Sequence, residues 1–179
     1  AGGRSGIRRR PGGWRAGLNS TGGGTTIKGL AINGFSGSGI FRNGLGGNTI
    51  TGNFIGLNSV GTSLSANSGS GIAVTSANNV IGGANPADRN IVSGNSGQGI
   101  DLNGATANAN TVQGNYVGTN KNGTAAIGNG VFGIISEQGA NNNVIGSSTG
   151  TSPGGACTGA GNLASGHAQS GITLHFGGN

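Results

Sequence analysis

Short segments in which apolar and polar residues alternate recur along this chain, and clusters of Gly, Asn, Ser and Thr separate them. The stretch from Asn90 to Gly118 holds three of them, NIVSGN, GIDL and NTVQGNYVG. A period of two is typical of strands with one buried face, and Gly/Asn clusters are typical of turns. No stretch shows the spacing of a helical face. The pattern predicts an all-β protein made of short strands.

The same phrases return along the sequence. NTVQGNYVGTNKNGTAA from Asn110 repeats NTITGNFIGLNSVGTSL from Asn48, and NNVIGS from Asn142 repeats NNVIGG from Asn78. A Gly-Ile phrase supplies a further series, at Ile40, Ile72, Ile100, Ile134 and Ile172. Recurrence of this kind indicates a solenoid, in which each repeat buries its apolar edge only against its neighbours.

The spacing of the Gly-Ile phrases predicts the make-up of each coil. Successive phrases are 32, 28, 34 and 38 residues apart, whereas a coil of three short strands with tight turns needs roughly twenty residues. We therefore expect three strands per turn (a Gly-Ile strand, an Asn-x-Val/Ile strand and a third such as NIVSGN) with inserted loops. The loop GLNSVGTSLSANS returns as GTNKNGTAAIGNG, so these insertions should stack on one flank. A tighter coil of about twenty residues is the alternative.

Asparagines recur at the starts and ends of the expected strands. Because Asn tolerates left-handed backbone and bonds to neighbouring main chain, stacked Asn side chains form ladders along repeated strands. We expect such ladders from the residues Asn48, Asn79, Asn110 and Asn143 at strand starts and Asn53, Asn95 and Asn115 at strand ends.

The phrases RNIVSGNSGQGIDL, NTVQGNYVGTN and NNVIGG resemble those of right-handed parallel β-helix repeat proteins of the pectin-lyase-like class. The resemblance covers about residues 26 to 175. It implies a right-handed parallel β-helix solenoid of about five coils and three parallel sheets over residues 26–179, preceded by a basic Gly/Arg-rich segment or cap at residues 1–25. Such proteins are commonly secreted and bacterial. They include polysaccharide lyases, glycoside hydrolases, esterases, phage spikes and adhesive stalks, so the resemblance does not settle function.

Charge is concentrated at the start of the chain. Of the nine basic residues behind the net charge of +6, five precede residue 26: Arg4, Arg8, Arg9, Arg10 and Arg15. The remaining body is almost neutral, and a nucleic-acid surface would need Lys and Arg along one face with aromatics to stack bases. We expect no nucleic-acid partner.

Composition also limits the cellular locations and the kinds of chemical site that we expect for this protein. The one cysteine, Cys157, allows no internal disulfide and no cysteine-based metal site. No apolar run approaches the length of a membrane span, and no cluster of Asp predicts a calcium site. An array this poor in charge and rich in Asn, Gly, Ser and Thr resembles secreted solenoids, so we expect a secreted or cell-surface protein. We expect it to need no metal or cofactor.

Alignment of the Gly-Ile phrases predicts which side chains share one outward face. In each phrase the isoleucine should point inward, the next residue outward, the third inward and the fourth outward. The outward second positions are Phe41, Ala73, Asp101, Ile135 and Thr173, and the outward fourth positions are Asn43, Thr75, Asn103, Glu137 and His175. Among them are two of the three acids and one of the two histidines.

Three of these residues are candidates for catalysis. Asp101 and Glu137 would be one rung and two residues apart, about 8 Å, within the window of roughly 6.5–9.5 Å for the acid and base of an inverting glycoside hydrolase. His175 would lie beside Glu137 as a proton carrier. Substrate-binding candidates on the same face are Phe41, Asn103, Thr75 and Thr173. The alternative is a solvated polar face with no chemistry.

Two functions therefore stay open. The first is a secreted β-helix that binds a polysaccharide or cell-surface glycan, and hydrolyses it or a related ester. The second is a non-catalytic stalk or adhesin segment of a larger surface protein, with end-to-end self-association. Sugar tracks usually need exposed stacking rings, and we expect Phe41 on the face but Phe54, Tyr116 and Phe132 inward. An ice-binding face is not expected, because Thr49, Thr51, Thr111 and Thr173 should not line up.

Overall fold

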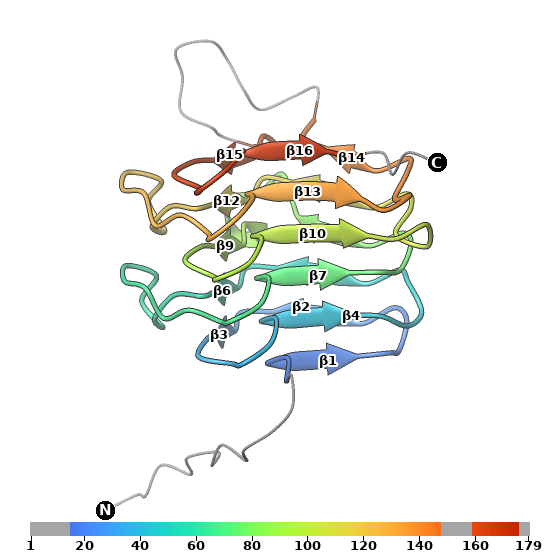
Figure 1. Ribbon diagram of the computed structural model, residues 1–179, viewed down its shortest axis with the longest axis horizontal. Coiled ribbons are helices and arrows are strands. Elements are labelled where there is room, and N and C mark those ends of the chain that lie inside the picture. Colours follow the sequence, from blue (N-terminus) through green and yellow to red (C-terminus); the bar gives the residue numbers. More distant parts are fainter. Residues whose placement is uncertain (1–14, 148–158, 176–179) are drawn as a thin grey trace, which may run out of the picture.

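The computed structural model describes residues 15–147 and 159–175. Over these ranges the chain winds as a parallel β-helix with three all-parallel sheets, and neighbouring strands in each sheet come from successive coils (Figure 1). The predicted all-β solenoid of about five coils is confirmed. Arg4, Arg8, Arg9, Arg10, Trp14 and Cys157 lie outside the described residues.

The first sheet, sheet A, is formed by the Gly-Ile strands. In the described chain its six strands are β1 (Leu18–Ser20), β4 (Ile40–Arg42), β7 (Ile72–Val74), β10 (Ile100–Asn103), β13 (Ile134–Glu137) and β16 (Ile172–Leu174). The isoleucines of the phrase are register partners on every neighbouring pair of strands from β4 to β16, as the alignment predicted. Strand β1 lies within residues 1–25, and its Leu18 pairs with Ile40, 22 positions later. This first coil has the length expected of a coil without inserted loops.

The other two sheets come from the second and third strands of each coil. Sheet B comprises, over the same ranges, β2 (Thr26–Lys28), β5 (Thr49–Thr51), β8 (Val80–Gly82), β11 (Thr111–Gln113) and β14 (Val144–Ile145). Sheet C comprises, again as far as the chain is described, β3 (Ala31–Ile32), β6 (Phe54–Ile55), β9 (Ile91–Val92), β12 (Tyr116–Val117) and β15 (Leu163–Ala164). The division into three strands per turn is therefore confirmed.

Loops inserted between the strands account for the uneven coil lengths. One contains a 3-10 turn, η1 (Pro86–Asp88). Two others are hairpin-like, closed by antiparallel bridges between Leu57 and Leu64 and between Thr119 and Ala126. These two hairpins stack, because the Lys121 N–H donates to the Gly61 carbonyl at 2.9 Å. The expected stacking of the repeated loop is confirmed.

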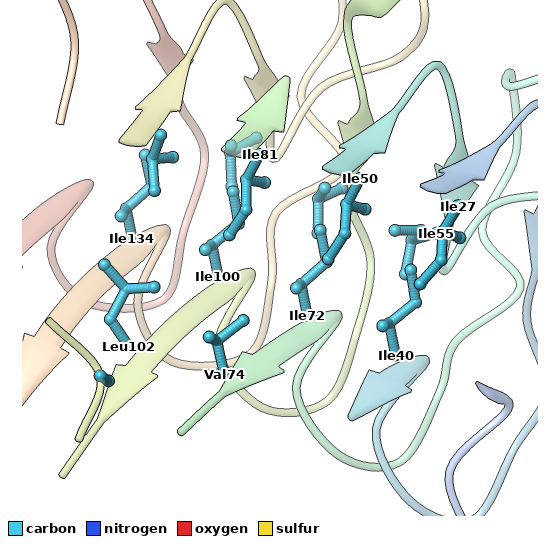
Figure 2. Packing of buried hydrophobic residues seen from close by; sticks show 14 of the residues in the cluster. Ile27, Ile40, Ile50, Ile55, Ile72, Val74, Ile81, Ile100, Leu102 and Ile134 are labelled. Atoms are coloured by element: carbon cyan, nitrogen blue, oxygen red, sulfur yellow. The ribbon is translucent and has the colours of Figure 1, made fainter. Parts of the chain in front are cut away.

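A slender aliphatic column fills the coil. The isoleucines of sheet A meet those of sheets B and C in successive layers, seen in Figure 2 as Ile40 with Ile55 and Ile72 with Ile50. Ile40, Ile72, Ile100 and Ile134 are completely buried. Val74 and Leu102 add a second buried residue to β7 and β10. Burial of one such side chain is worth about 1.5–3 kcal/mol.

Asparagine ladders run alongside this column; the predicted strand-start series is confirmed, whereas Asn95 belongs to a different ladder from Asn53 and Asn115. The side-chain amide of each Asn donates to the side-chain oxygen of the Asn one coil on, at 2.7 to 3.1 Å. The ladders are Asn48–Asn79–Asn110–Asn143, Asn53–Asn90–Asn115–Asn162 and Asn67–Asn95–Asn129. His167 continues the third, since its Nδ1 accepts the Asn129 N–H at 3.2 Å. The ladders give buried turn amides the partners they require.

One expectation about inward positions was wrong. Phe54 and Tyr116 do not point into the column but lie in a second apolar cluster, with Leu57, Ile91, Ile127 and Leu163. The starting residue of each short strand sets which side chains point out, and a strand of two residues fixes that start weakly. The four threonines do not form one row, as expected: Thr49 and Thr111 share a row of sheet B but Val80 separates them, and Thr173 lies on sheet A.

Candidate functional site

The outer side of sheet A carries an open depression of about 290 Å³ across β4, β7 and β10. Its central row is Phe41, Ala73 and Asp101, which are register partners on successive strands. Ala73 has the smallest side chain of the three, so its position between Phe41 and Asp101 leaves space at the surface. Ser38 and Ser70 line the depression from the residues before the strands, and Thr75 and Asn103 line it from the strand ends. We call this feature the sheet A depression.

Asp101 is the most perturbed acid among the described residues. Its neighbours in the row are Ala73 on one side and Ile135 on the other, and only 9% of its surface is exposed. Burial, reinforced by the negative charge of Glu137 and opposed by the Asn103 amide, raises the pKa of Asp101 to about 6. Its Oδ1 has no hydrogen-bond partner within the described chain. This carboxyl group is therefore partly protonated near neutral pH.

Glu137 has a different environment one coil away. Asn103 and Glu137 are register partners, and the Asn103 side-chain amide donates to Glu137 Oε1 at 3.0 Å. The side chain is half-buried rather than enclosed. The face thus offers two unlike carboxyl groups: Asp101 is buried and has a raised pKa, whereas Glu137 is half-buried and accepts a hydrogen bond from Asn103.

The remaining predicted residues lie on the next coil. Thr173 is the register partner of Ile135, and its Oγ1 is buried with no partner in the part of the chain described. The His175 backbone N–H donates to the Ser136 carbonyl at 2.8 Å, which continues the register so that His175 follows Glu137 along the face. His175 is exposed. All three catalytic candidates share this face on consecutive coils, with His175 directly after β16; their chemical roles stay predictions.

Ser38 and Ser70 were missed as site residues. Ser38 is almost fully buried, and its Oγ has no hydrogen-bond partner within residues 15–147 and 159–175. The Ser70 Oγ donates to the Gln98 side chain at 3.0 Å. Both precede the glycine of a Gly-Ile phrase, so the repeated spelling Ser-Gly-Ile was the available signal. The alignment began at the isoleucine and did not consider the turn before it.

Arg42 faces away from the depression. It occupies the inward third position of β4, in register with Val74, and is completely buried. Its Nη2 donates to the carbonyls of Gly22 and Leu45, while Nε and Nη1 have no partner in the described residues. Burial lowers the pKa of the guanidinium. The guanidinium therefore binds main-chain carbonyls in the turns of the first two coils and does not reach the outer face.

The described residues form neither a metal-ligand cluster nor a membrane-spanning helix. Across the described ranges, no three His, Cys, Asp or Glu side chains gather as a metal ion would require. In the same part of the chain no helix has the length and apolar character to cross a membrane. Neither protein-family models nor curated proteins nor solved structures give a match to this chain.

Proposed function

We propose that the outer face of sheet A binds a polysaccharide, or a related ester, and that Asp101 and Glu137 hydrolyse it. The observation that supports this most directly is the sheet A depression, which has an aromatic ring at one end and a partly protonated carboxyl group at the other. Its volume of about 290 Å³ lies at the lower end of small-molecule sites, roughly 300–1,000 Å³.

The binding step follows from the chemistry of the lining. Phe41 is half-exposed and can stack against the apolar face of a sugar ring. Ser38, Thr75 and Asn103 supply hydroxyl and amide groups suited to sugar hydroxyls. Because successive coils repeat every 4.8 Å or so, a glycan chain laid along the axis would meet similar groups on several strands.

The hydrolytic step follows from the two carboxyl groups. Asp101 would donate a proton to the leaving oxygen, and Glu137 would accept one from the attacking water. The register separates them by one coil and two residues, about 8 Å, which leaves room for that water in an inverting mechanism. His175, beside Glu137, would carry the proton to solvent.

The wider assignment belongs to the same proposal. We infer a secreted or cell-surface protein of the pectin-lyase-like class of bacterial β-helix proteins. Its support is the resemblance of the repeated phrases, the near absence of charge after residue 25 and the ladder-bearing parallel coil.

A panel of plant and bacterial polysaccharides and simple esters tests the proposal, with binding and hydrolysis measured separately. Phe41→Ala should weaken binding at least tenfold, whereas Thr49→Ala, on the outer row of sheet B, should leave it unchanged. Asp101→Asn and Glu137→Gln should each lower hydrolysis at least a hundredfold while binding persists. Binding without hydrolysis would remove the catalytic half of the proposal. No binding to any polymer or ester would remove all of it.

The alternative is a non-catalytic stalk or adhesin segment that associates end to end. One observation favours it: the last described strands expose apolar side chains, with Val144, Ile172 and Leu174 at 54%, 48% and 59%. A further coil, or the first coil of a second copy, would cover them. Concentration-dependent association that Leu174→Lys abolishes, together with no glycan binding, would favour the stalk.

A further inference from the structure

The distribution of charge around the sheet A depression indicates what sort of glycan it accepts. Along the outer rows of sheet A, as far as the chain is described, the acidic residues are Asp101 and Glu137, and Lys and Arg are absent. The face is therefore acidic although the chain as a whole carries a net charge of +6.

The basic side chains of the coil lie away from the depression. Arg42 comes from a strand beneath the depression, but its guanidinium lies inside the coil. Lys28 pairs with Asp88 at 3.0 Å on the side of sheet B, and Arg89 lies 3.9 Å above the ring of Tyr116 on the side of sheet C. None of these three cations can pair with an acidic ligand in the depression. Lys121, a further described cation, lies in the hairpin closed by Thr119 and Ala126, which follows β12 of sheet C.

Apart from the buried Arg42, Arg15 is the described arginine nearest to the depression in register. Its carbonyl accepts the Gly37 N–H at 2.9 Å, so its backbone runs beside the residue before Ser38. It lies one coil before Phe41, at the end of the depression away from Asp101 and Glu137. An acidic sugar over the two carboxyl groups would meet His175 beside Glu137, but no Lys or Arg of the described coil to neutralise it.

The unpartnered atoms of the depression fit neutral groups. Ser38 Oγ and Asp101 Oδ1 are buried, line the same depression and have no partner among the described residues. A sugar hydroxyl both donates and accepts, so it can satisfy either atom. A carboxylate only accepts, and it would be repelled by Asp101 and Glu137 once these are ionised.

We infer that the depression accepts uncharged sugar units and discriminates against units that carry carboxylates. This inference rests on the proposed glycan binding and adds the class of ligand to it. The discrimination increases with pH, because Asp101 becomes fully ionised above the range of its raised pKa and then adds its repulsion to that of Glu137.

Matched polymers that share a backbone test the inference. We would compare methyl-esterified with free polygalacturonate, hydroxyethyl with carboxymethyl cellulose, and dextran with carboxymethyl dextran, at pH 7.5. For any backbone that binds, the neutral member should bind at least tenfold more tightly. Equal or tighter binding of the acidic member, lost in Phe41→Ala, would overturn the inference and leave glycan binding intact. No binding to either member of any pair would contradict the proposed function itself.

The direction of the salt dependence distinguishes binding at this face from electrostatic attraction to the basic N-terminal residues. If carboxylates on the face repel the acidic polymer, its binding should strengthen several-fold between 20 mM and 500 mM NaCl. Binding that weakens over that range and is lost in Phe41→Ala would show that the depression itself attracts the acidic polymer, and would overturn the inference. The variant Glu137→Gln should reduce the strengthening, whereas Arg15→Gln should not.

Discussion

The Asn103 side-chain amide donates a 3.0 Å hydrogen bond to Oε1 of Glu137, its register partner on the next coil. Asp101 lies two residues before Asn103 on the same strand, yet its neighbours across the sheet are Ala73 and Ile135. One strand thus supplies a neutral donor to one carboxylate and an apolar setting to another carboxyl group. The two acids differ because their register partners differ, not because their sequence contexts do.

Asp101→Asn should make the protein more stable at pH 7.5. The pKa of Asp101 is about 6 in the folded chain and near 3.9 when unfolded, so the folded state binds more protons between these values. Stability should therefore fall as pH rises from about 3.5 to 7.5, and the full loss is on the order of 3 kcal/mol. Urea unfolding of wild type and Asp101→Asn at several pH values over this range measures the change in unfolding free energy.

Glu137→Gln is the comparison for that experiment. It removes the smaller cause of the raised Asp101 pKa, a nearby negative charge, but leaves the larger cause, burial. It should retain most of the pH dependence, whereas Asp101→Asn should lose the part due to Asp101. Identical pH dependence in wild type and Asp101→Asn would show that folding does not raise the pKa of Asp101. Since Asp101→Asn should also lower hydrolysis, stability gained with activity lost would mark a functional site.

How far the sequence predicts this molecule depends on the length of the repeated phrase. The Gly-Ile phrases fix sheet A because the isoleucine and the alternating residues after it recur in the same places, and this brought Asp101, Glu137 and His175 onto one face. The outward positions of Phe54 and Tyr116 could not be predicted, since their strands have two residues and are covered by inserted hairpins. The depression itself depends on one small residue, Ala73, between two larger ones. Its shape requires packing that no single phrase encodes.

Asn90→Leu should destabilise the protein by about 2–4 kcal/mol. Asn90 is completely buried, its Nδ2 donates to the Ile50 carbonyl and to Asn115 Oδ1, and its Oδ1 accepts from Asn53. Leucine has similar volume but would leave these partners unpaired, at about 1–3 kcal/mol for each group. Denaturant midpoints measure the change. Asn122→Ala, at an exposed hairpin tip, should change the free energy of unfolding by less than about 0.5 kcal/mol.

Gly46→Ala should destabilise the coil by about 1–3 kcal/mol or more. A Cβ at residue 46 would lie 1.8 Å from the Ala77 carbonyl oxygen, so the backbone of the next coil would have to move. Gly22 has negative φ and only the Thr25 hydroxyl within 4 Å, at 3.8 Å. Gly22→Ala should therefore be neutral or slightly stabilising. Thermal unfolding of the two variants compares them, and equal melting temperatures would contradict the close approach of the coils.

His167 should make the last coil sensitive to acid. Its Nδ1 accepts the Asn129 N–H at 3.2 Å and its Nε2 lies 3.1 Å from the Val117 carbonyl, so the neutral ring with hydrogen on Nε2 fits both partners. Burial lowers the pKa of His167, and the Val117 contact opposes this only in part. The unfolded state then binds more protons, so the stability that His167 contributes is present above about pH 6.5 and is lost as pH falls below it.

His167→Asn should remove that loss, because asparagine occupies the matching positions of the same ladder at Asn95 and Asn129 and does not titrate. Asp101 acts in the opposite direction between pH 4 and 6, so the wild-type curve by itself would not isolate either group. Both proteins contain Asp101, so its contribution cancels in the difference between their free energies of unfolding. We expect this difference in unfolding free energy to favour the variant increasingly from pH 8 to pH 5.

Amide exchange of β16 should report the same trend, because His167 contacts Gly133, whose N–H donates to the Ser170 carbonyl just before β16. A difference that does not vary with pH would show that His167 can accept a proton without loss of the ladder.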